Sequence, residues 1–163
     1  MLRALMALAE PLDRIIVIED TAELCIPHPR VVSLETRTAN TEGVGAIAVS
    51  ELIRQALRMR PDRLVVGECR GADVVDMFIA FTTGHPGGGS TLHASSLRDV
   101  PTRLSALTAL AGFSARAGAA LAVAAIDVVV HVAVANGRRR LIVGRPIVSA
   151  SAKLSIEPWS NES

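Results

Sequence analysis

Acidic and histidine side chains follow three short apolar segments of this 163-residue sequence. Glu19 and Asp20 end the segment RIIVIED, Glu68 ends RLVVGE, and His93 follows a Gly-rich run. Carboxylates can hold Mg²⁺ through water and orient a nucleophilic water, and arginines can stabilise charge on a phosphate in transfer. These residue types favour phosphoryl-transfer chemistry.

Three strands are predicted to position these groups. Arg14–Glu19 and Arg63–Gly67 are short, continuous apolar runs, which is typical of strands buried on both faces of a parallel sheet. Ser90–His93 is predicted as a third short strand after the glycines, which themselves indicate a tight turn. Because ligands of open parallel sheets bind outside the carboxyl ends of the strands, we expect the acids and the histidine to share one rim.

The remaining elements follow from helical spacing, caps and turn residues. A further short strand is predicted at Val31–Leu34. Asn136-Gly137 is a strong hairpin signal between strands at Ile126–Ala135 and Arg139–Val148. The tail from Ser149 is polar and expected to be loose. Helices are predicted at Met1–Ala9, from Ser50 to just before Pro61, and at Ala72–Thr82, Leu97–Ala111 and Ala115–Ala125.

Composition limits the classes of ligand and the cellular compartment that can be expected. A formal net charge of +1 and an aromatic content of 2% provide neither a strong field nor stacking surfaces, so no direct nucleic-acid ligand is expected. The cysteines, Cys25 and Cys69, show no metal-ligand spacing and no disulfide framework, which favours a reducing cytoplasm.

One stretch, residues 117–135, is apolar enough to be weighed as a membrane span. Asp127 and His131 lie inside it, and a charge at bilayer depth costs about 2.5 to 3.5 kcal/mol on insertion scales. Valines at alternate positions from 128 to 134 also follow the strand period. A buried strand, and no transmembrane segment, is therefore expected.

Four segments carry a resemblance to a known family. They are IEDTAEL (Ile18–Leu24), LETR (Leu34–Arg37), ALRMRPDRLVVGECRG (Ala56–Gly71) and TGHPGGGSTLHA (Thr83–Ala94). In this order and spacing they resemble consecutive motifs of the Tad/CpaF-type ATPases, within the type II/IV secretion ATPase superfamily. The resemblance runs from about Leu2 to Val148.

The resemblance implies roles for the acids and the histidine, with ATP and Mg²⁺ as cofactors. Glu19 and Asp20 lie in what resembles the Asp box and would organise the metal and the attacking water. Glu68 lies in what resembles an atypical Walker B segment and would coordinate the metal or activate the water. His93, in what resembles the His box, would couple the γ-phosphate to conformational change.

Three arginines match family positions that contact phosphate or an adjacent subunit: Arg37, Arg58 and Arg70. With Asp20 they form the implied nucleotide-binding set, and the sequence leaves open which of them act within a subunit and which across a boundary.

The implied fold is a three-layer α/β core of the RecA-like P-loop NTPase class with a C-terminal helical and hairpin part. It would cover residues 1–148, followed by a polar tail over 149–163. The sequence contains no G-x-x-x-x-G-K-[ST], because its one lysine is Lys153. The core is therefore expected to be truncated at its N-terminal edge, with uncovered sheet edge as a consequence.

Three interpretations of this departure stay open: a gene fragment or remnant, one half of a split ATPase, or a nonhydrolysing subunit that regulates an intact homologue. The resemblance implies a homohexamer at the cytoplasmic face of the inner membrane, with secretion or pilus platform proteins as partners. A less favoured alternative is a metal-dependent phosphohydrolase that uses Glu19, Asp20, Glu68 and His93 without a phosphate loop.

Overall fold

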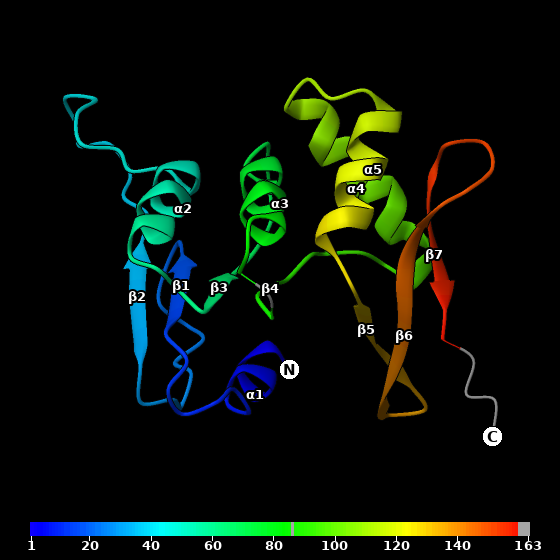
Figure 1. Ribbon diagram of the computed structural model, residues 1–163, viewed down its shortest axis with the longest axis horizontal. Coiled ribbons are helices and arrows are strands. Elements are labelled where there is room, and N and C mark those ends of the chain that lie inside the picture. The colour runs from blue at the N-terminus through cyan, green and yellow to red at the C-terminus, as the bar shows by residue number, and fades with distance from the viewer. Residues whose placement is uncertain (86, 160–163) are drawn as a thin grey trace. The chain divides into compact units, whose positions relative to one another are not determined.

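The computed structural model describes residues 1–85 and 87–159 and divides into two compact units, residues 1–91 and 92–163 (Figure 1). Each unit has its own sheet and its own helices. The units are described separately below.

The first unit is built on a four-stranded parallel sheet in the order β2-β1-β3-β4. In the central register Ile18 of β1 lies between Leu34 of β2 and Val66 of β3. Val65 and Val66 of β3 pair with the two residues of β4. The strands are β1 Ile15–Glu19, β2 Val31–Glu35, β3 Arg63–Val66 and β4 Gly89–Ser90.

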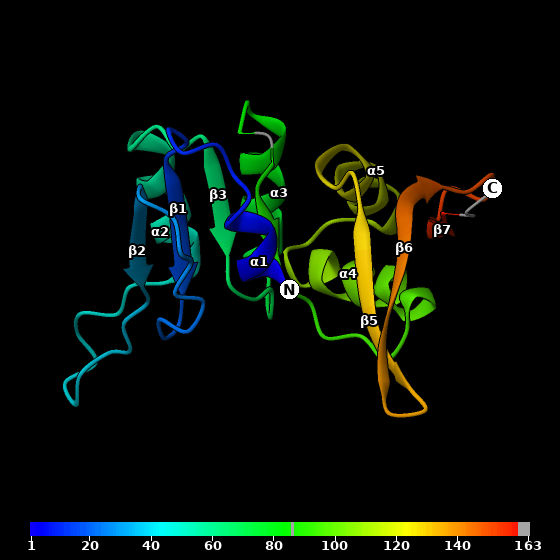
Figure 2. The same cartoon turned by 90° about the horizontal axis from the view of Figure 1, so that it is seen from below.

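Helices cover both faces of this sheet. Figures 1 and 2 show α2 (Val49–Arg58) and α3 (Val74–Thr82) on one face and α1 (Leu2–Met6) on the other. Strand residues alternate between faces, so β1 and β3 are apolar on both. The α1 face forms one buried cluster whose members are Met6, Ile15, Val17, Ile26 and Val65.

The second unit packs two helices against a three-stranded antiparallel sheet in the order β5-β6-β7. The β5–β6 hairpin turns at Asn136 and Gly137, whose φ values of 52° and 71° suit a two-residue turn that matches strand twist. Its elements are the 3₁₀ turn η1 Leu97–Asp99, α4 Val100–Leu110, α5 Ala115–Ala125, β5 Val129–Ala135, β6 Arg138–Val148 and β7 Leu154–Pro158.

Three expectations from the sequence are wrong. The strand predicted at Ser90–His93 ends at Ser90, because the next backbone groups bond elsewhere: Thr91 O accepts from Cys69 N at 3.0 Å. The expectation of a loose tail fails over Leu154–Pro158, where Leu154 and Ile156 alternate with polar residues and form β7 against β6. The strand after Asp127 exists, but it is not buried, and its Val134 is 72% exposed.

Among the described residues, no single helix has the length and apolar character of a membrane span. Only the helix pair Leu97–Leu110 and Ala115–Ala125, bent by 114°, reaches that threshold, and only by length and composition.

Candidate functional site

The carboxyl ends of β1 and β3 bring the predicted acids of the first unit together. Ile18 of β1 and Val66 of β3 are paired, and Gly67 N donates to Ile18 O at 2.8 Å. The two segments therefore stay side by side for one residue beyond β3. Glu19 closes β1, and Glu68 comes two residues after β3. The expectation that these acids share one rim is confirmed within this unit.

Arg70 connects two of the acids directly. Its Nη2 lies 2.6 Å from Glu68 Oε2, and its Nη1 lies 3.4 Å from Asp20 Oδ2. The hydrogen bond and charge of Glu68, with a smaller contribution from Asp20, raise the pKa of Arg70, so the guanidinium stays charged. The arginine side chain is 67% exposed while Glu68 is 21% exposed, so the pair faces solvent from the arginine side.

Glu19 holds the loop that follows β1. Its Oε1 accepts from Leu24 N at 3.1 Å and from Glu23 N at 3.3 Å. A carboxylate bonded to successive amides is fixed in direction and stays a strong acceptor. This acid therefore shapes the IEDTAEL loop as well as ending the strand.

Gly67 makes room for that carboxylate. A β-carbon at this position would lie 2.8 Å from Glu19 Cγ and 3.4 Å from Ile18 O. Contacts under about 3.0 Å force atoms to move, so only glycine fits between the two strands without displacing Glu19. Contact with Glu19, the last residue of β1, thus requires a glycine at position 67, directly before Glu68.

Asp20 is held from two sides. Thr36 Oγ1 donates to Asp20 Oδ1 at 3.0 Å, while Arg70 approaches the other oxygen. Thr36 N also donates to Glu19 O at 3.0 Å, which continues the β1–β2 pairing to this point. The LETR segment therefore contributes a threonine that the sequence interpretation did not single out.

Behind Glu68, the Gly-rich segment packs against β3. Thr91 Oγ1 donates to Gly67 O, and a β-carbon at Gly88 would lie 2.4 Å from Leu64 O. These close approaches account for the small residues of the run. Cys69 lies beneath, with its Sγ 3.2 Å from Ser90 Oγ, and burial raises the pKa of this thiol to about 11.

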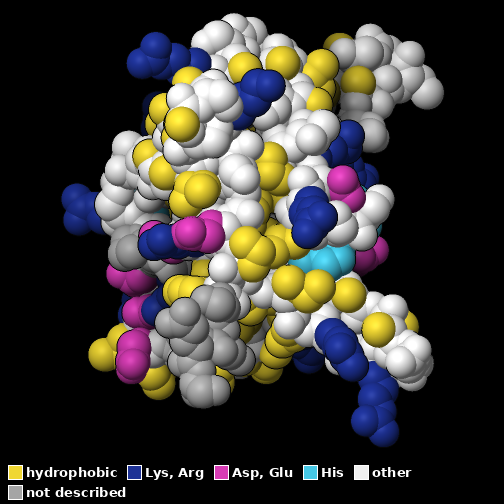
Figure 3. Space-filling view, turned by 90° about the vertical axis from the view of Figure 1, so that its right-hand side faces the viewer, with side chains coloured by type: hydrophobic (Ala, Val, Ile, Leu, Met, Phe, Trp, Pro, Cys, Tyr) yellow, Lys and Arg dark blue, Asp and Glu magenta, His cyan; other side chains and the backbone are white. Residues whose placement is uncertain are grey.

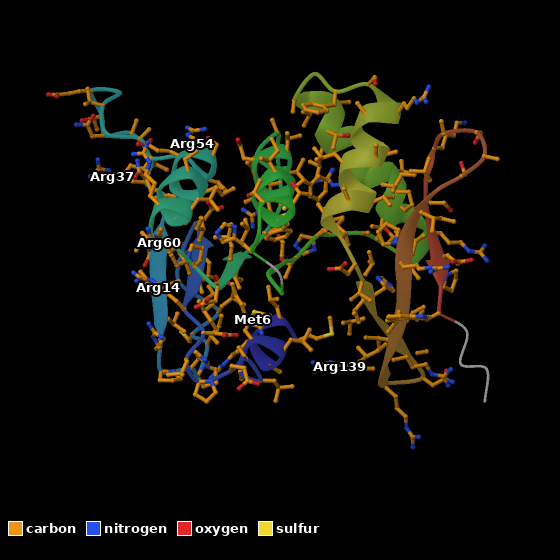
Figure 4. All side chains as sticks on the ribbon, viewed as in Figure 1. Met6, Arg14, Arg37, Arg54, Arg60 and Arg139 are labelled. Atoms are coloured by element: carbon orange, nitrogen blue, oxygen red, sulfur yellow. The ribbon has the colours of Figure 1, made fainter. Side chains whose placement is uncertain are left out.

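The other two predicted arginines have no described contact with the acids. Arg37 pairs its backbone with Ile47 and donates from Nε to Gly45 O, so it braces the loop that leads to α2. Figure 4 shows Arg37 and Arg54 near the end of the first unit that carries α2 and this loop. Arg58 is exposed in the last turn of α2. Phosphate or partner contacts by Arg37 and Arg58 stay predictions.

His93 belongs to the second unit, where it is exposed. Its predicted place beside the acids and its coupling role therefore stay predictions. The Gly-rich run before His93 correctly predicts the strand β4, but this strand ends at Ser90 and does not extend to His93.

The metal prediction concerns Glu19, Asp20 and Glu68. Within the described residues, no three His, Cys, Asp or Glu side chains are grouped as a metal site would require. Mg²⁺ in phosphoryl-transfer sites is held by one or two carboxylates together with water and phosphate oxygens. Glu68 and Asp20 suit that chemistry, but both carboxylates pair with Arg70 in this structure. A metal ion would therefore share the carboxylates with Arg70 or displace the arginine from them.

Asp73 is a further acid near this edge that the sequence did not single out. Burial, followed by the charges of Asp76 and Asp20, raises its pKa. Its position immediately before α3 was the available signal, because aspartate is frequent at helix starts.

Comparison with known proteins gives concordant results. The family described as type II/IV secretion system protein matches residues 1–141. The chain is 50% identical over 142 residues to a putative conjugal transfer protein of Mycobacterium tuberculosis, covering 86% of this chain and 40% of that protein. It is 40% identical over 96 residues to the protein VirB11 of Rhizobium radiobacter, covering 59% and 28% of the two chains.

Solved structures agree on the fold. The VirB11 ATPase of the Brucella suis type IV secretion system, solved with sulphate, aligns over 86% of this chain and 42% of its own, with a TM-score of 0.69 and 28% identity. The Legionella pneumophila ATPase DotB aligns over 96% of this chain and 38% of its own, with a TM-score of 0.56 and 19% identity. The chain spans about 40% or less of the length of the curated relatives named here.

Proposed function

This chain belongs to the type II/IV secretion system protein family, and from that premise we propose that it carries the acidic half of an ATP-hydrolysing site. The observation that supports the proposal most directly is Arg70, which reaches both Glu68 and Asp20 at the end of two paired strands. In this proposal the ATPase acts in Tad-type pilus assembly or secretion. Its subunits form a hexamer at the cytoplasmic face of the inner membrane.

The proposed division of work follows the contacts. Glu68 is the less exposed of the two acids that Arg70 contacts. It orients the attacking water or accepts its proton. Asp20, fixed by Thr36, and Arg70 face the phosphate end of the nucleotide. Glu19 keeps the IEDTAEL loop in place through its bonds to the Leu24 and Glu23 amides, so it acts chiefly as a positioning residue.

Mg²⁺, when bound with ATP, would neutralise charge on the phosphate oxygens. Glu68 and Asp20 are the residues that would hold it, through water. Arg70 must then release at least one carboxylate, which makes this arginine a candidate sensor of the bound nucleotide. The RecA-like class of the core belongs to the same proposal.

In P-loop NTPases a phosphate loop holds the triphosphate, and no G-x-x-x-x-G-K-[ST] occurs in these 163 residues. We therefore propose that the loop is supplied by a segment outside this sequence. The nonhydrolysing subunit that regulates an intact homologue remains the alternative proposal, because the same acids would be retained without turnover.

The test is calorimetric ATP binding and phosphate release with Mg²⁺, measured for the chain alone and for the chain mixed with a phosphate-loop segment taken from a relative. Turnover in the mixture that Glu68→Gln abolishes supports the proposal. Glu157→Gln is the matched control, because Glu157 also pairs with an arginine, Arg145, at 2.6 Å but lies on β7.

Two outcomes would count against this proposal. Turnover by the chain alone would favour a metal-dependent phosphohydrolase. Stable association with the added segment or with an intact homologue, without turnover, would favour the regulatory subunit.

A further inference from the structure

The segment Gly87–Thr91 forms one edge of the sheet in the first unit. It begins with three consecutive glycines, contributes only the two-residue strand β4, and contains no fully buried residue. Glycine has no side chain to bury and loses more conformational freedom on folding than other residues. Apolar packing by the segment's own side chains therefore contributes little to holding it on β3, and contacts from neighbouring residues must do so.

Arg63, the first residue of β3, contacts the start of this segment. Its Nη1 donates to Gly87 O at 3.3 Å, and a β-carbon at Gly87 would overlap Nη1 and lie 3.1 Å from Cζ. Gly87 also has a φ of 75°, a left-handed conformation that glycine adopts without strain. The guanidinium thus occupies the space in which a side chain at position 87 would lie.

Asp13 fixes the direction of this guanidinium. Arg63 Nε lies 2.6 Å from Asp13 Oδ2, and the two side chains are only 28% and 21% exposed. Lysine and arginine side chains in Figure 3, by contrast, project from the surface. Asp13 lies two residues before β1, and Ile15 of β1 pairs with Arg63. Different nitrogens of one guanidinium therefore connect the starts of the two inner strands to the Gly-rich segment.

The other end of the segment holds the backbone on both sides of Glu68. Thr91 Oγ1 donates to Gly67 O, and Thr91 O accepts from Cys69 N at 3.0 Å. Ser90 Oγ lies 3.2 Å from Cys69 Sγ. The direction in which the Glu68 side chain leaves the backbone therefore depends on the position of Thr91.

We propose that Arg63 is a positioning residue of the ATP-hydrolysing site proposed above. Together with Asp13 it holds Gly87–Thr91 on β3, and Thr91 in turn fixes the backbone at Glu68. Arg63 acts through this segment, because it begins β3 whereas Glu68 follows the end of that strand. The inference rests on the proposed function for the role of Glu68, but the attachment of the segment can be measured without nucleotide.

Cys69 reports whether the segment stays attached. It is 3% exposed, and its sulfur contacts Ser90 of β4 and, at 3.3 Å, Met77 of α3. After Cys25→Ser, Cys69 is the one thiol of the chain. The experiment measures how fast a chromogenic disulfide reagent modifies this thiol in the full chain, at several low urea concentrations. Modification through detachment of the segment depends little on urea because little surface is exposed, whereas modification through global unfolding accelerates with urea.

We expect slow modification in the Cys25→Ser chain, through global unfolding. Adding Arg63→Ala should accelerate it about tenfold in the absence of urea, at the strength of a hydrogen bond to a charged group, and with little dependence on urea. Gly87→Ala should have a similar effect, because its β-carbon displaces the guanidinium. This second variant keeps the test decisive if Arg63→Ala does not fold.

Arg63→Lys separates the ion pair from the contact with Gly87. A single nitrogen would replace the two that now bond to Asp13 and to Gly87 O. If that lysine pairs with Asp13, it leaves Gly87 without its donor, so the thiol should react as fast as in Arg63→Ala. Slow modification in Arg63→Lys would show that the ion pair alone holds the segment, against the proposal.

Two controls separate detachment from a general loss of stability. Gly84→Ala places a side chain at another glycine of positive φ, 95°, but with no atom within 4 Å of its β-carbon. Ile53→Val shortens a buried side chain of α2 and lowers stability without touching the segment. Both should keep the urea-dependent modification expected of global unfolding.

The mixture with the added phosphate-loop segment tests the consequence for catalysis. Arg63→Ala should lower kcat roughly tenfold and leave KM near its unaltered value, because a displaced Glu68 disturbs the attacking water rather than nucleotide binding. Absence of turnover in the unaltered mixture would count against the proposed function. The thiol measurement would still decide whether Arg63 holds the segment, so the two failures are distinguishable.

Three results would overturn the inference. The first is modification of Arg63→Ala and Gly87→Ala that is as slow as in the unaltered background. The second is faster modification that rises with urea as steeply as in Ile53→Val, which would mean global destabilisation. The third is rapid modification with an unchanged kcat, which would show that detachment of the segment does not reach Glu68.

Discussion

Gly67 lies so close to Glu19 that a β-carbon at position 67 would stand 2.8 Å from Glu19 Cγ. The two residues follow paired positions of β1 and β3, so the contact is fixed by the register of the sheet. The glycine before Glu68 and the acid that ends β1 are thus one steric unit, although they are 48 positions apart in sequence.

Gly67→Ala is therefore expected to destabilise the protein by about 1 to 3 kcal/mol, as inserted carbons do in well-packed sites. Chemical denaturation measures the change. The control is a double-mutant cycle with Glu19→Ala, which removes the Cγ atom. The two changes together should cost less than the sum of the single changes, and strict additivity would contradict the steric explanation.

Arg70→Ala should leave the thermal midpoint nearly unchanged, because the side chain is 67% exposed and surface ion pairs contribute little. In the ATPase assay with the added phosphate-loop segment it should lower turnover roughly tenfold or more, as loss of a charge-stabilising donor does. Arg145→Ala, which breaks the comparable pair with Glu157, serves as control. Equal activity of the two variants would remove Arg70 from the proposed site.

Much of this arrangement follows from the sequence. The apolar runs predicted β1 and β3, and their parallel pairing follows from continuous rather than alternating hydrophobicity. The hairpin at Asn136-Gly137 was predictable because few residues other than these adopt positive φ readily.

Other features depend on contacts that no local pattern encodes. Thr36 acquires its role from the β1–β2 register, and the strand at β4 stops because Thr91 bonds to Gly67 and Cys69 across the chain. The strand β7 was obscured by serines around Leu154 and Ile156. The valines after Asp127 predict a buried strand, but an apolar sequence does not show whether another element covers each face of the strand, and Val132 and Val134 of β5 are exposed.

The two thiols should differ sharply in reactivity. Cys25 is exposed, whereas Cys69 is buried and its pKa is raised to about 11, so little thiolate forms at neutral pH. A chromogenic disulfide reagent should modify one thiol quickly in the native protein and the second only after unfolding. Cys25→Ser should abolish the fast phase, and a remaining fast phase would show that Cys69 is accessible.

Asp73→Asn should stabilise the protein at neutral pH by about 0.5 kcal/mol, a value discounted because the side chain is partly exposed. Burial raises the pKa of Asp73, so the folded state holds the proton more tightly than the unfolded state. Stability is then lost as the pH rises through the folded-state pKa, and the penalty is complete at neutral pH.

The gain from Asp73→Asn should shrink as the pH falls through the folded-state pKa and be smallest below about 4, where the carboxyl is mostly protonated in both states. Thermal unfolding across this range measures it. Glu51→Gln, which removes an acid from the first turn of α2, should instead lower stability slightly, because acids favour helix starts. A gain from Asp73→Asn that does not vary with pH would contradict the electrostatic cause.

Leu154→Ala tests whether β7 belongs to the fold. Leu154 is 9% exposed and pairs with Val148, so its truncation should cost about 2 kcal/mol, at the lower end for buried leucines. Lys153→Ala, an exposed neighbour, should have little effect in the same denaturation experiment. Identical midpoints for both variants would show that the strand contributes nothing.

The all-parallel sheet of the first unit has a consequence for how fast each part acquires its structure. β1 pairs with segments that begin at Val31 and Arg63, and β3 pairs with a segment that begins at Gly89. Every strand pairing in that sheet therefore closes a long loop of the chain. The hairpin of the second unit closes over two residues. Because folding rates fall as the sequence separation of contacts rises, the second unit is expected to fold first. The acids of the first unit would come together only after its slower chain closure.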